Sequence, residues 1–518
     1  MPKVSPIQDN FNVGEISPLM YGRVGTDAYK AALMTCFNNI PLVQGGTMRR
    51  PGTYWSDEVR YSLKATRGVP FKYSTVQAYV VETGDLYFRF KKNNGPVREN
   101  GFETTLTITG ITRAAPGVLT YTGTDPVNGD TVDLDGVVGM TEVNGQRFLV
   151  TNVNAGANTF ELGTVNTTNY GTYTSGGTVY LNRLISAVTA ANPGVVTYNG
   201  PDPVNAQTVH ISGVVGMTQL NGNRYTVANV NVGAKTFELS GTDTSAYTAY
   251  VSGGLAETAC MISAVTKANP GVVTYVGNDP ANGDMFDVSG IVGMTELNNR
   301  RFTVANVDTG ANTFELTDQG GNVNTTSFTT YTSGGVLSRV YTLTSPYAEA
   351  DLFQVKFTQS ADVMYLFHPT YPTRKLTRRS DTKWSCTLLK YTDGPYLTTN
   401  ATTTTLTPGA ATGNAVTITA SSVVGINGGD GFKTTDIGRL IRLKEGSVWG
   451  WCRIVGRTST TVVTVDIAST LTNINAKTSW RLGLYSDTTG WPGAGTFHED
   501  RLVTLGNTSE PERGDTSK

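Results

Sequence analysis

The chain has 518 residues, of which 16% are charged and 58 are glycine, and its formal net charge at pH 7 is −1. This length suffices for roughly three to five domains with sizeable cores. The abundance of Thr, Asn, Val, Tyr and Gly favours short strands joined by tight turns, because β-branched and aromatic side chains suit a pleated surface. The sequence therefore predicts an all-β, multidomain protein. Four widely spaced cysteines without a CxxC pair argue against a zinc site and a dense disulfide framework.

Residues 1–107 are predicted to be the N-terminal part of a β-rich body domain. They begin without the apolar segment of a signal peptide, so we expect synthesis in a cytosol with reduced thiols. The chain also lacks a run of about 18 apolar residues, so no membrane-spanning segment is expected.

Three tandem copies of one unit follow, with a spacing of 77 residues. The phrase Pro-Gly-Val-Leu/Val-Thr-Tyr begins at Pro116, Pro193 and Pro270, and the phrases Gly-Met-Thr and Thr-Phe-Glu-Leu recur at the same interval. A constant spacing held through three phrases indicates repeats of one folded module. The predicted repeats are residues 108–184, 185–261 and 262–341.

Alternation of apolar and polar residues predicts the inward positions of each repeat. In the second copy, Val209 and Ile211 fall on one face of a strand, and His210 falls on the opposite face, where we expect solvent. Asn221-Gly222 is predicted to form a hairpin turn, because both residues tolerate positive φ. About six such strands per copy fit a small closed β-barrel or sandwich.

Two recurring features of the repeats are open to a functional interpretation. The Asp-Pro-x-Asn-Gly-Asp phrase, at residues 125–130 and 279–284, has the oxygen donors of a calcium loop, but its residues are also typical of turns. The second copy replaces the last two residues by Ala206 and Gln207, which favours the turn. An arginine also recurs at one position per copy, where it either binds a ligand or braces a turn or neighbouring copy. These repeat-equivalent arginines are Arg147, Arg224 and Arg301.

After the repeats, residues 342–399 are predicted to continue the body domain, residues 400–484 to form a further inserted β-sandwich or barrel, and residues 485–518 to return to the body. Trp449 and Trp451 share one face of a strand in the insertion, which suits either packing or stacking on sugars. Residues 1–100 carry 13 basic and 8 acidic side chains, residues 101–340 carry 9 and 18, and residues 341–518 carry 18 and 15. This asymmetry indicates either separate partners for separate parts or a soluble acidic appendage.

No catalytic fingerprint is present, and the three histidines, His210, His368 and His498, lie far apart in the sequence. The chain is therefore predicted not to be an enzyme, and no cofactor or metal is predicted.

An ordered series of short phrases covers about residues 1–100 and 342–511. It includes Phe11-Asn-Val-Gly-Glu-Ile-Ser-Pro18, Asn39-Ile-Pro-Leu-Val-Gln-Gly45, Phe357-Thr-Gln-Ser-Ala-Asp362, Asp436-Ile-Gly-Arg439 and Gly490-Trp-Pro492. In this order the phrases resemble the tail tubular or nozzle proteins of short-tailed bacteriophages, which are also described as tail stabilisation or hub proteins. The repeats resemble the small FCCH-like β-barrels found in phage tail proteins and named after a domain of ubiquitin-activating enzymes.

The resemblance implies a structural subunit of the virion, made in the host cytoplasm. It implies a homo-oligomeric ring, usually of six subunits, that conducts double-stranded DNA and contacts tail adaptor or portal-side proteins and fibres or other appendages. Family members typically continue further, so this C-terminus is expected to be short. Basic residues of the flanks are candidates for channel or interface contacts: Arg49, Arg50, Arg374, Lys375, Arg378 and Arg379.

Two other functions remain open at this point. The repeats suit adhesion to a host surface glycan or the anchoring of receptor-binding fibres, and the third hypothesis is a tail-borne polysaccharide hydrolase.

Overall fold

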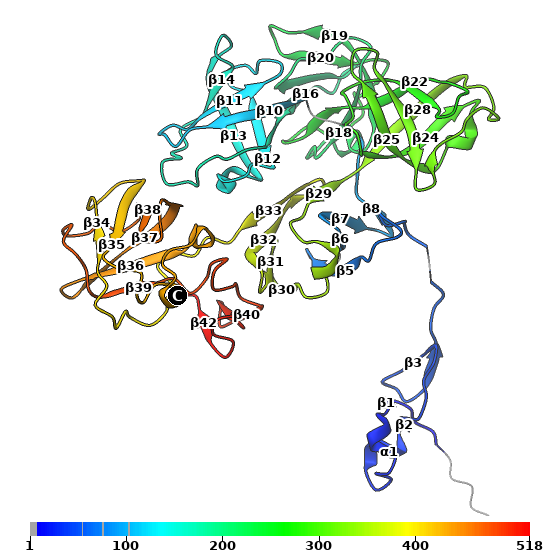
Figure 1. Cartoon of the computed structure of the whole chain (residues 1–518). Coiled ribbons are helices and arrows are strands. Elements are labelled where there is room, and N and C mark those ends of the chain that lie inside the picture. The colour runs from blue at the N-terminus through cyan, green and yellow to red at the C-terminus, as the bar shows by residue number, and fades with distance from the viewer. Residues whose placement is uncertain (1–7, 54, 75–76, 102–103) are drawn as a thin grey trace, which may run out of the picture. The chain divides into compact units, whose positions relative to one another are not determined.

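The computed structural model describes residues 8–53, 55–74, 77–101 and 104–518 (Figure 1). By their internal contacts the residues form two units, Met1–Asp57 and Glu58–Lys518. Strands dominate both units, and the all-β prediction is confirmed. In the described part of the chain, no helix has the length and apolar character needed to cross a membrane.

The first unit is held by short backbone ladders. β1 (Gly14–Glu15) pairs in parallel with β2 (Ala32–Leu33), and β3 (Asn39–Pro41) forms a hairpin with β4 (Thr47–Arg49). One turn of 3₁₀-helix, η1 (Pro18–Met20), and one turn of α-helix, α1 (Asp27–Lys30), connect β1 to β2.

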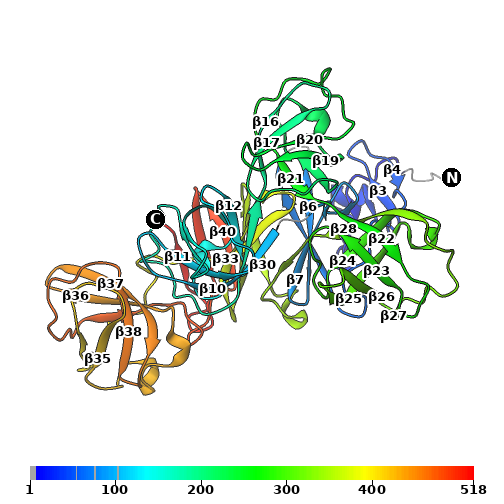
Figure 2. The same ribbon diagram turned by 90° about the horizontal axis from the view of Figure 1, so that it is seen from above.

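The three repeats fold as three closed six-stranded barrels, and Figure 2 labels strands of each of them. In each barrel the strands are ordered first, second, fifth, fourth, third and sixth, and the sixth pairs back to the first. The first barrel comprises β10 (Thr104–Ile111), β11 (Val118–Thr122), β12 (Thr131–Asp135), β13 (Gln146–Asn154), β14 (Thr159–Leu162) and β15 (Thr178–Asn182). The second comprises β16 (Leu184–Val188), β17 (Val195–Asn199), β18 (Thr208–Ser212), β19 (Arg224–Asn231), β20 (Thr236–Leu239) and β21 (Leu255–Thr258). The third comprises β22 (Cys260–Val265), β23 (Val272–Val276), β24 (Met285–Val292), β25 (Arg300–Asp308), β26 (Thr313–Asp318) and β28 (Ser333–Val340), with β9 (Arg98–Glu99) and β27 (Gly321–Asn322) added at its edges.

The recurring Gly-Met-Thr phrase has a structural reason. Gly139, Gly216 and Gly293 have φ of +91°, +91° and +94°, and a Cβ there would lie 2.0–2.2 Å from a backbone carbonyl oxygen. Only glycine fits this position. The methionine that follows is fully buried in each barrel core, and a 3₁₀ turn comes next: η2 (Thr141–Val143), η3 (Thr218–Leu220) and η4 (Thr295–Leu297).

The predicted hairpin at Asn221-Gly222 is only half right. Gly222 has φ +81°, but Asn221 has φ −66° and therefore does not form the predicted two-residue turn. Its side-chain amide instead bonds both the N–H and the carbonyl of Val214, each at 2.8 Å. The third copy behaves alike, because Asn299 has φ +59° and Asn298 bonds the backbone of Ile291. The amide thus ties the 3₁₀ turn to the preceding strand.

The body domain is made of two sheets that come from both sides of the repeats. The first sheet contains β5 (Arg67–Lys72), β6 (Ala78–Gly84), β7 (Tyr87–Lys92), β8 (Gly95–Pro96) and β29 (Thr342–Thr344). The second contains β30 (Lys356–Ser360), β31 (Val363–His368), β32 (Tyr371–Ser380) and β33 (Lys383–Leu388), and η5 (Glu349–Asp351) precedes it.

An aromatic cluster joins these sheets. Trp384 of β33 stacks on Phe90 of β7 with ring centroids 4.0 Å apart, and it contacts Phe71 and Tyr79 edge-on. Tyr341 donates its backbone N–H to the carbonyl of Val97 at 3.0 Å, so the chain leaves and re-enters the body at adjacent points. The three barrels are therefore an insertion in one folded body.

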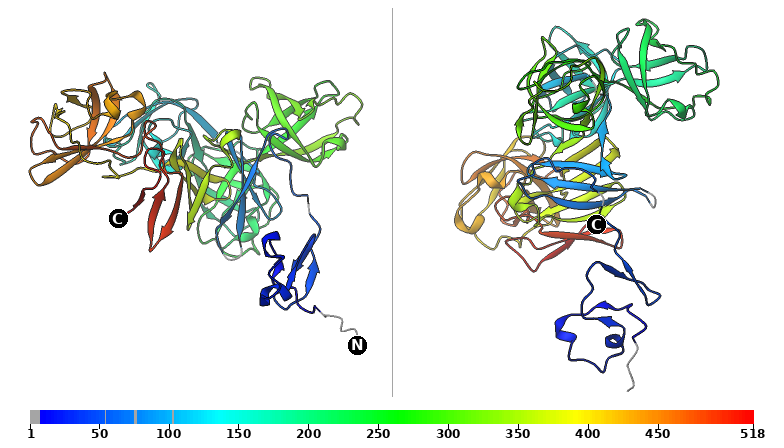
Figure 3. Two further views of the ribbon diagram at one scale, coloured as in Figure 1. Left: turned by 60° about the horizontal axis from the view of Figure 1, so that its bottom comes forward. Right: turned by 90° about the vertical axis from the view of Figure 1, so that its right-hand side faces the viewer.

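A further six-stranded sheet and a small C-terminal sheet complete the second unit (Figure 3). This part contains the turns η6 (Asn427–Gly429) and η7 (Thr434–Asp436). Asp436, the last residue of η7, forms a buried ion pair in which Arg439 Nη1 lies 2.9 Å from Asp436 Oδ1. The six strands are β34 (Leu406–Pro408), β35 (Val416–Ala420), β36 (Leu440–Glu445), β37 (Val448–Arg457), β38 (Val462–Ile467) and β39 (Trp480–Leu482). The C-terminal sheet comprises β40 (Ala494–His498), β41 (Arg501–Leu505) and β42 (Gly514–Thr516).

Candidate functional site

The recurring arginine of each barrel lies on the outer face of its fourth strand, opposite one residue of the third strand. Strand register pairs Arg147 with Asp133 and Arg301 with Asp287. Arg147 Nε donates to Asp133 Oδ1 at 3.0 Å, and Arg301 Nε donates to Asp287 Oδ1 at 2.7 Å. In the first and third barrels the arginine therefore braces two strands of its own barrel, whereas Arg224 of the second barrel faces His210 instead of an aspartate.

In the first barrel this pair also contacts the body. Arg379 of β32 lies 3.1 Å from Asp133 Oδ2 through Nη2 and donates from Nη1 to the carbonyl of Gly145 at 3.0 Å. Close by, Lys390 Nζ lies 3.1 Å from Glu142 Oε1. Arg379, a predicted channel or interface residue, thus connects the body to the first barrel.

Two carboxyl groups at this junction have pKa values that are shifted in opposite directions. Burial favours a raised pKa for Asp133, but the Arg147 hydrogen bond and the charges of Arg379, Arg147 and Lys383 outweigh it and lower the pKa. For Asp135, on the same strand, burial dominates over Lys383 and Arg379 and raises the pKa to about 6. The junction therefore holds one carboxylate whose charged form is stabilised and one whose charged form is destabilised.

The second barrel corrects the prediction for His210. Its side chain is not solvent-facing: the residue is 6% exposed, and Nδ1 lies 3.7 Å from Glu257 Oε2. Alternation correctly placed His210 outside the barrel core, but other parts of the chain cover that outer face. Gly101 packs so closely on Glu257 that a Cβ would lie 2.6 Å from the glutamate Cβ. Arg224, opposite His210, donates to Asn100 Oδ1 at 3.3 Å.

The third barrel is held by the segment that leaves the body. Arg98 Nε donates to Asp287 Oδ2 at 2.5 Å, and β9 pairs with β28. Arg339 Nε in turn donates to Glu99 Oε2 at 2.5 Å. The same outer face is thus covered by another part of the second unit in all three barrels. Sequence reasoning found the recurring arginines and singled out Arg379 as a channel or interface candidate, but it missed Arg98 and Asn100, which lie outside the repeats and contact the third and second barrels.

The other predicted basic residues divide into two groups. On β32, Arg378 donates to Tyr79 Oη at 3.0 Å and lies 3.2 Å from Asp381, and Arg374 Nη1 donates to the carbonyl of Cys386 at 3.5 Å. These two arginines stabilise the body from within. Lys375 is half-buried on the same strand. In the first unit, the side chains of Arg49 and Arg50 are exposed.

In the candidate calcium loops, the side-chain oxygens that could bind a cation accept hydrogen bonds within the turn instead. The tyrosine that ends the second strand donates its hydroxyl to the first aspartate in every copy: Tyr121 to Asp125 at 2.9 Å, Tyr198 to Asp202 at 2.7 Å and Tyr275 to Asp279 at 2.7 Å. The last residue of the phrase, Asp130, Gln207 or Asp284, accepts a backbone N–H three residues earlier. In the second copy Ala206 takes the glycine position with φ +69°. The phrase forms the same turn in all three copies, whether its last residue is an aspartate or a glutamine.

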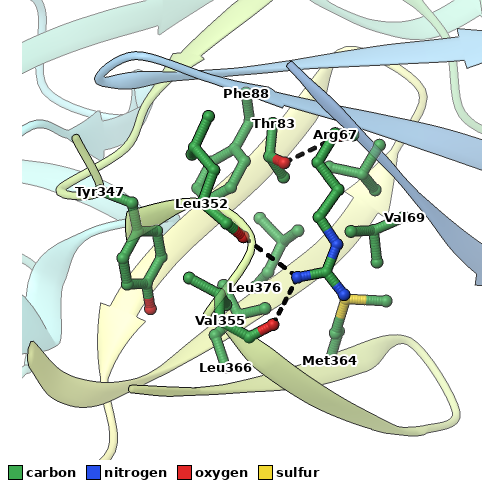
Figure 4. Close-up of a pocket in the computed structure, with 11 residues that line it drawn as sticks. Arg67, Val69, Thr83, Phe88, Tyr347, Leu352, Val355, Met364, Leu366 and Leu376 are labelled. Carbon is green, nitrogen blue, oxygen red and sulfur yellow. Dashed lines mark hydrogen bonds between the residues drawn. The ribbon is translucent and has the colours of Figure 1, made fainter. Parts of the chain in front are cut away.

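The body encloses a narrow apolar cavity between its sheets (Figure 4). The guanidinium of Arg67 lies at this cavity, where Nη1 donates to the carbonyls of Leu352 at 3.0 Å and Val355 at 2.7 Å. The cavity has room for no more than about one water molecule, so it is a packing defect rather than a binding site. Arg67 braces the loop after η5.

The paired tryptophans lie on the outer face of the inserted sheet. Trp449 is half-buried beneath cations: Arg481, Arg442 and Lys444 lie 5.1, 5.4 and 5.9 Å from its ring centroid. Arg442 also lies 3.2 Å from Asp393. The indole is thus largely packed against charged side chains of its own domain.

The histidines and cysteines occupy separate surroundings. His368 is buried with Nε2 4.0 Å from Asp351, and His498 is exposed beside Glu499. Among the residues that the structure describes, no group of three His, Cys, Asp or Glu side chains is placed to hold a metal ion. Burial raises the pKa of Cys260 to about 12, which keeps this thiol neutral at physiological pH.

Closed barrels of this kind, repeated three times, define a tandem β-barrel protein. Residues 116–183, 191–259 and 268–341 match the model of the FCCH domain of ubiquitin-activating enzyme E1. No curated protein matches the chain significantly. The chain therefore carries three tandem FCCH-like barrels, and these repeats account for the middle of the sequence.

Proposed function

We propose that the chain is a non-enzymatic structural subunit of a bacteriophage tail, which forms an oligomeric ring that conducts the genome and anchors fibres or other appendages. One observation supports this most strongly. The two flanking segments that resemble nozzle proteins, although separated by the three barrels, meet in one body in which β29 pairs with β7. The parts of the resemblance in β5–β8 and β29–β33 thus belong to one body, into which the barrels are inserted, whereas the phrases at the start of the chain lie in the separate unit Met1–Asp57.

The way the barrels are held also suits a structural role. Charged pairs at Asp133–Arg379, Glu142–Lys390 and Asp287–Arg98 fix them to the body and to the segment that precedes them. A module fixed in this way presents its remaining surface in a defined orientation, as an attachment point for an appendage requires.

Passage of DNA requires weak contacts that do not depend on sequence, because tight phosphate binding would stall the duplex. Of the predicted basic residues, Arg374, Arg378 and Arg379 are bonded within the chain, whereas Arg49 and Arg50 expose their side chains. In this proposal the exposed pair is the source of phosphate contacts.

Adhesion through the repeats is the second candidate function, and a threefold feature favours it. Val138, Val215 and Val292 occupy the same position in the three barrels and are 53%, 52% and 55% exposed. A surface presented three times in one chain binds a repetitive target, such as a host glycan, with gain from multivalency.

The test is the assembly state of the purified chain and of a variant that lacks the barrels. Residues 98–340 are deleted, and Val97 and Tyr341, whose backbones are hydrogen-bonded at 3.0 Å, are joined by a two-residue Gly-Ser linker. We expect both proteins to form rings of about six copies in negative-stain images, with masses to match.

A full-length chain that stays monomeric at high concentration would contradict the proposal. Glycan-array binding by the isolated repeat block, lost on replacing its exposed valines by serine, would favour adhesion instead.

A further inference from the structure

The first unit, as far as it is described, has a defined backbone but almost no core. Its strands are paired, Phe11 N–H donates to the carbonyl of Gly45 at 2.7 Å, and Gln8 Nε2 donates to the carbonyl of Ala32 at 2.8 Å. Cys36 N–H donates to Glu15 Oε2 at 2.9 Å. Among the described residues of this unit, Ala32 is the one residue with an apolar side chain that is buried, and the other buried residues are glycines.

Large apolar side chains of this unit face solvent instead. Leu19 is 90% exposed, Val43 89%, Phe37 78% and Trp55 76%, and Met34 is 69% exposed. Paired strands of two or three residues are marginal in water without an apolar face to bury, so the hydrogen bonds alone do not stabilise this unit.

The exposed apolar area is that of a protein interface. Nine large apolar side chains of this unit are exposed. Together they present on the order of 1,000 Å² of side-chain surface, comparable to the roughly 800 Å² that each partner buries in a stable interface. Exposed apolar surface of this total area favours an interaction partner.

We propose that the first unit is an arm that docks on the body of a second copy of this chain and acquires its apolar core there. The partner is a second copy because, in a ring, every arm has the body of a neighbouring copy within reach, so that no arm stays undocked. This choice of partner rests on the proposed ring. The body presents apolar side chains for such a contact, since Leu63 is 100% exposed and Phe353 is 60% exposed.

Two arm substitutions test the docking in the full chain. Phe37→Glu with Val43→Glu places two charges on the arm, and both positions are exposed in the single chain, so its own fold is preserved. We expect the dissociation constant of the oligomer to rise by about 100-fold, since buried anchors of this kind dominate interface affinity. The control is Val424→Glu with Ile474→Glu, which adds the same charges at exposed apolar positions of the inserted domain and leaves the oligomer unchanged.

A photo-crosslinking residue in place of Phe37 identifies the occupant. Docking on a second copy gives a covalent product of twice the 55.3 kDa chain mass, with crosslinks into residues 58–518 of the other copy. If the oligomer persists in the arm variant and crosslinks form only within one chain, the docking of the arm on a second copy is refuted, whereas the proposed ring is not. If the wild-type chain forms no oligomer, both the proposed ring and the proposed docking of the arm are refuted.

Discussion

Replacing Trp384 tests whether the two flanks of the barrels form one body. Its indole is 3% exposed and stacks on Phe90, which lies on the other side of the three barrels in the sequence. Its Nε1 also donates to the carbonyl of Asp381 at 2.9 Å. Trp384→Ala removes the side chain that joins the two sheets.

The magnitude follows from burial. An indole buries roughly 150–250 Å², worth about 4–6 kcal/mol at 25 cal/mol per Å², and large-to-alanine substitutions in cores cost about 3–5 kcal/mol. Lost aromatic pairs with Phe71 and Phe90 add about 1 kcal/mol. We expect the free energy of opening of the body to fall by about 4 kcal/mol, a large part of the stability of a typical domain.

Hydrogen exchange followed by mass spectrometry measures this change locally. Peptides from residues 67–92 lose protection in Trp384→Ala, while peptides from residues 184–258, in the second barrel, keep theirs. Trp384→Phe retains an aromatic ring and loses less. Unchanged protection of residues 67–92 would refute the single body, because two independent domains would not share this effect.

Three further predictions concern the barrels. The contact of the first barrel with the body is most stable at about pH 4. Below the ordinary aspartate pKa of 3.8, Asp133, whose pKa is lowered, loses its stabilising contribution, and between 3.8 and about 6 Asp135, whose pKa is raised, loses its own. Hydrogen exchange of the first barrel, compared across pH between the wild type and Asp133→Asn, checks this, because the substitution removes the loss of stability at low pH. Cys260 resists iodoacetamide at pH 8 until the chain is unfolded, since its pKa is about 12, and labelling of the native protein at this residue would be contrary evidence. We expect calcium to leave the melting temperature of the isolated repeat block unchanged, because Asp125 already accepts a hydrogen bond from the Tyr121 hydroxyl. A calcium-dependent rise in the melting temperature that Asp125→Ala abolishes would establish a metal site.

Period-two patterning predicted the barrel cores well. Val209 and Ile211, expected to face inward, are fully buried, and Phe237 and Leu239 lie in the same core. These positions obey local rules, since alternation decides the face of a strand. Alternation does not show what covers the opposite face, which is why the expected exposure of His210 was wrong.

The junction could not be predicted for a related reason. Arg379 is only one of several channel or interface candidates in the sequence, and nothing in the local sequence marks Arg98. Their partners cannot be identified from the sequence, because they lie 189 and about 250 residues away along the chain. Likewise, the contact of Trp384 with Phe90 depends on topology that no spacing encodes. The spacing of the repeated phrases was enough to identify the modules, whereas the contacts between modules could be identified only from the three-dimensional structure.

The charge asymmetry of the sequence acquires a physical explanation at these junctions. The acidic block and the basic flanks indicate either separate partners or a soluble acidic appendage. In the structure, several of the charges meet within the chain, at Asp133–Arg379 and Asp287–Arg98. Because Asp133 is buried, salt screens its pairs with Arg147 and Arg379 less than pairs on the surface. Loss of both arginines would leave a carboxylate buried without compensation, which costs more than the pairs contribute. The acidic barrels are thus matched to the basic body that carries them, and the charges that remain outside these junctions are the ones available to other molecules.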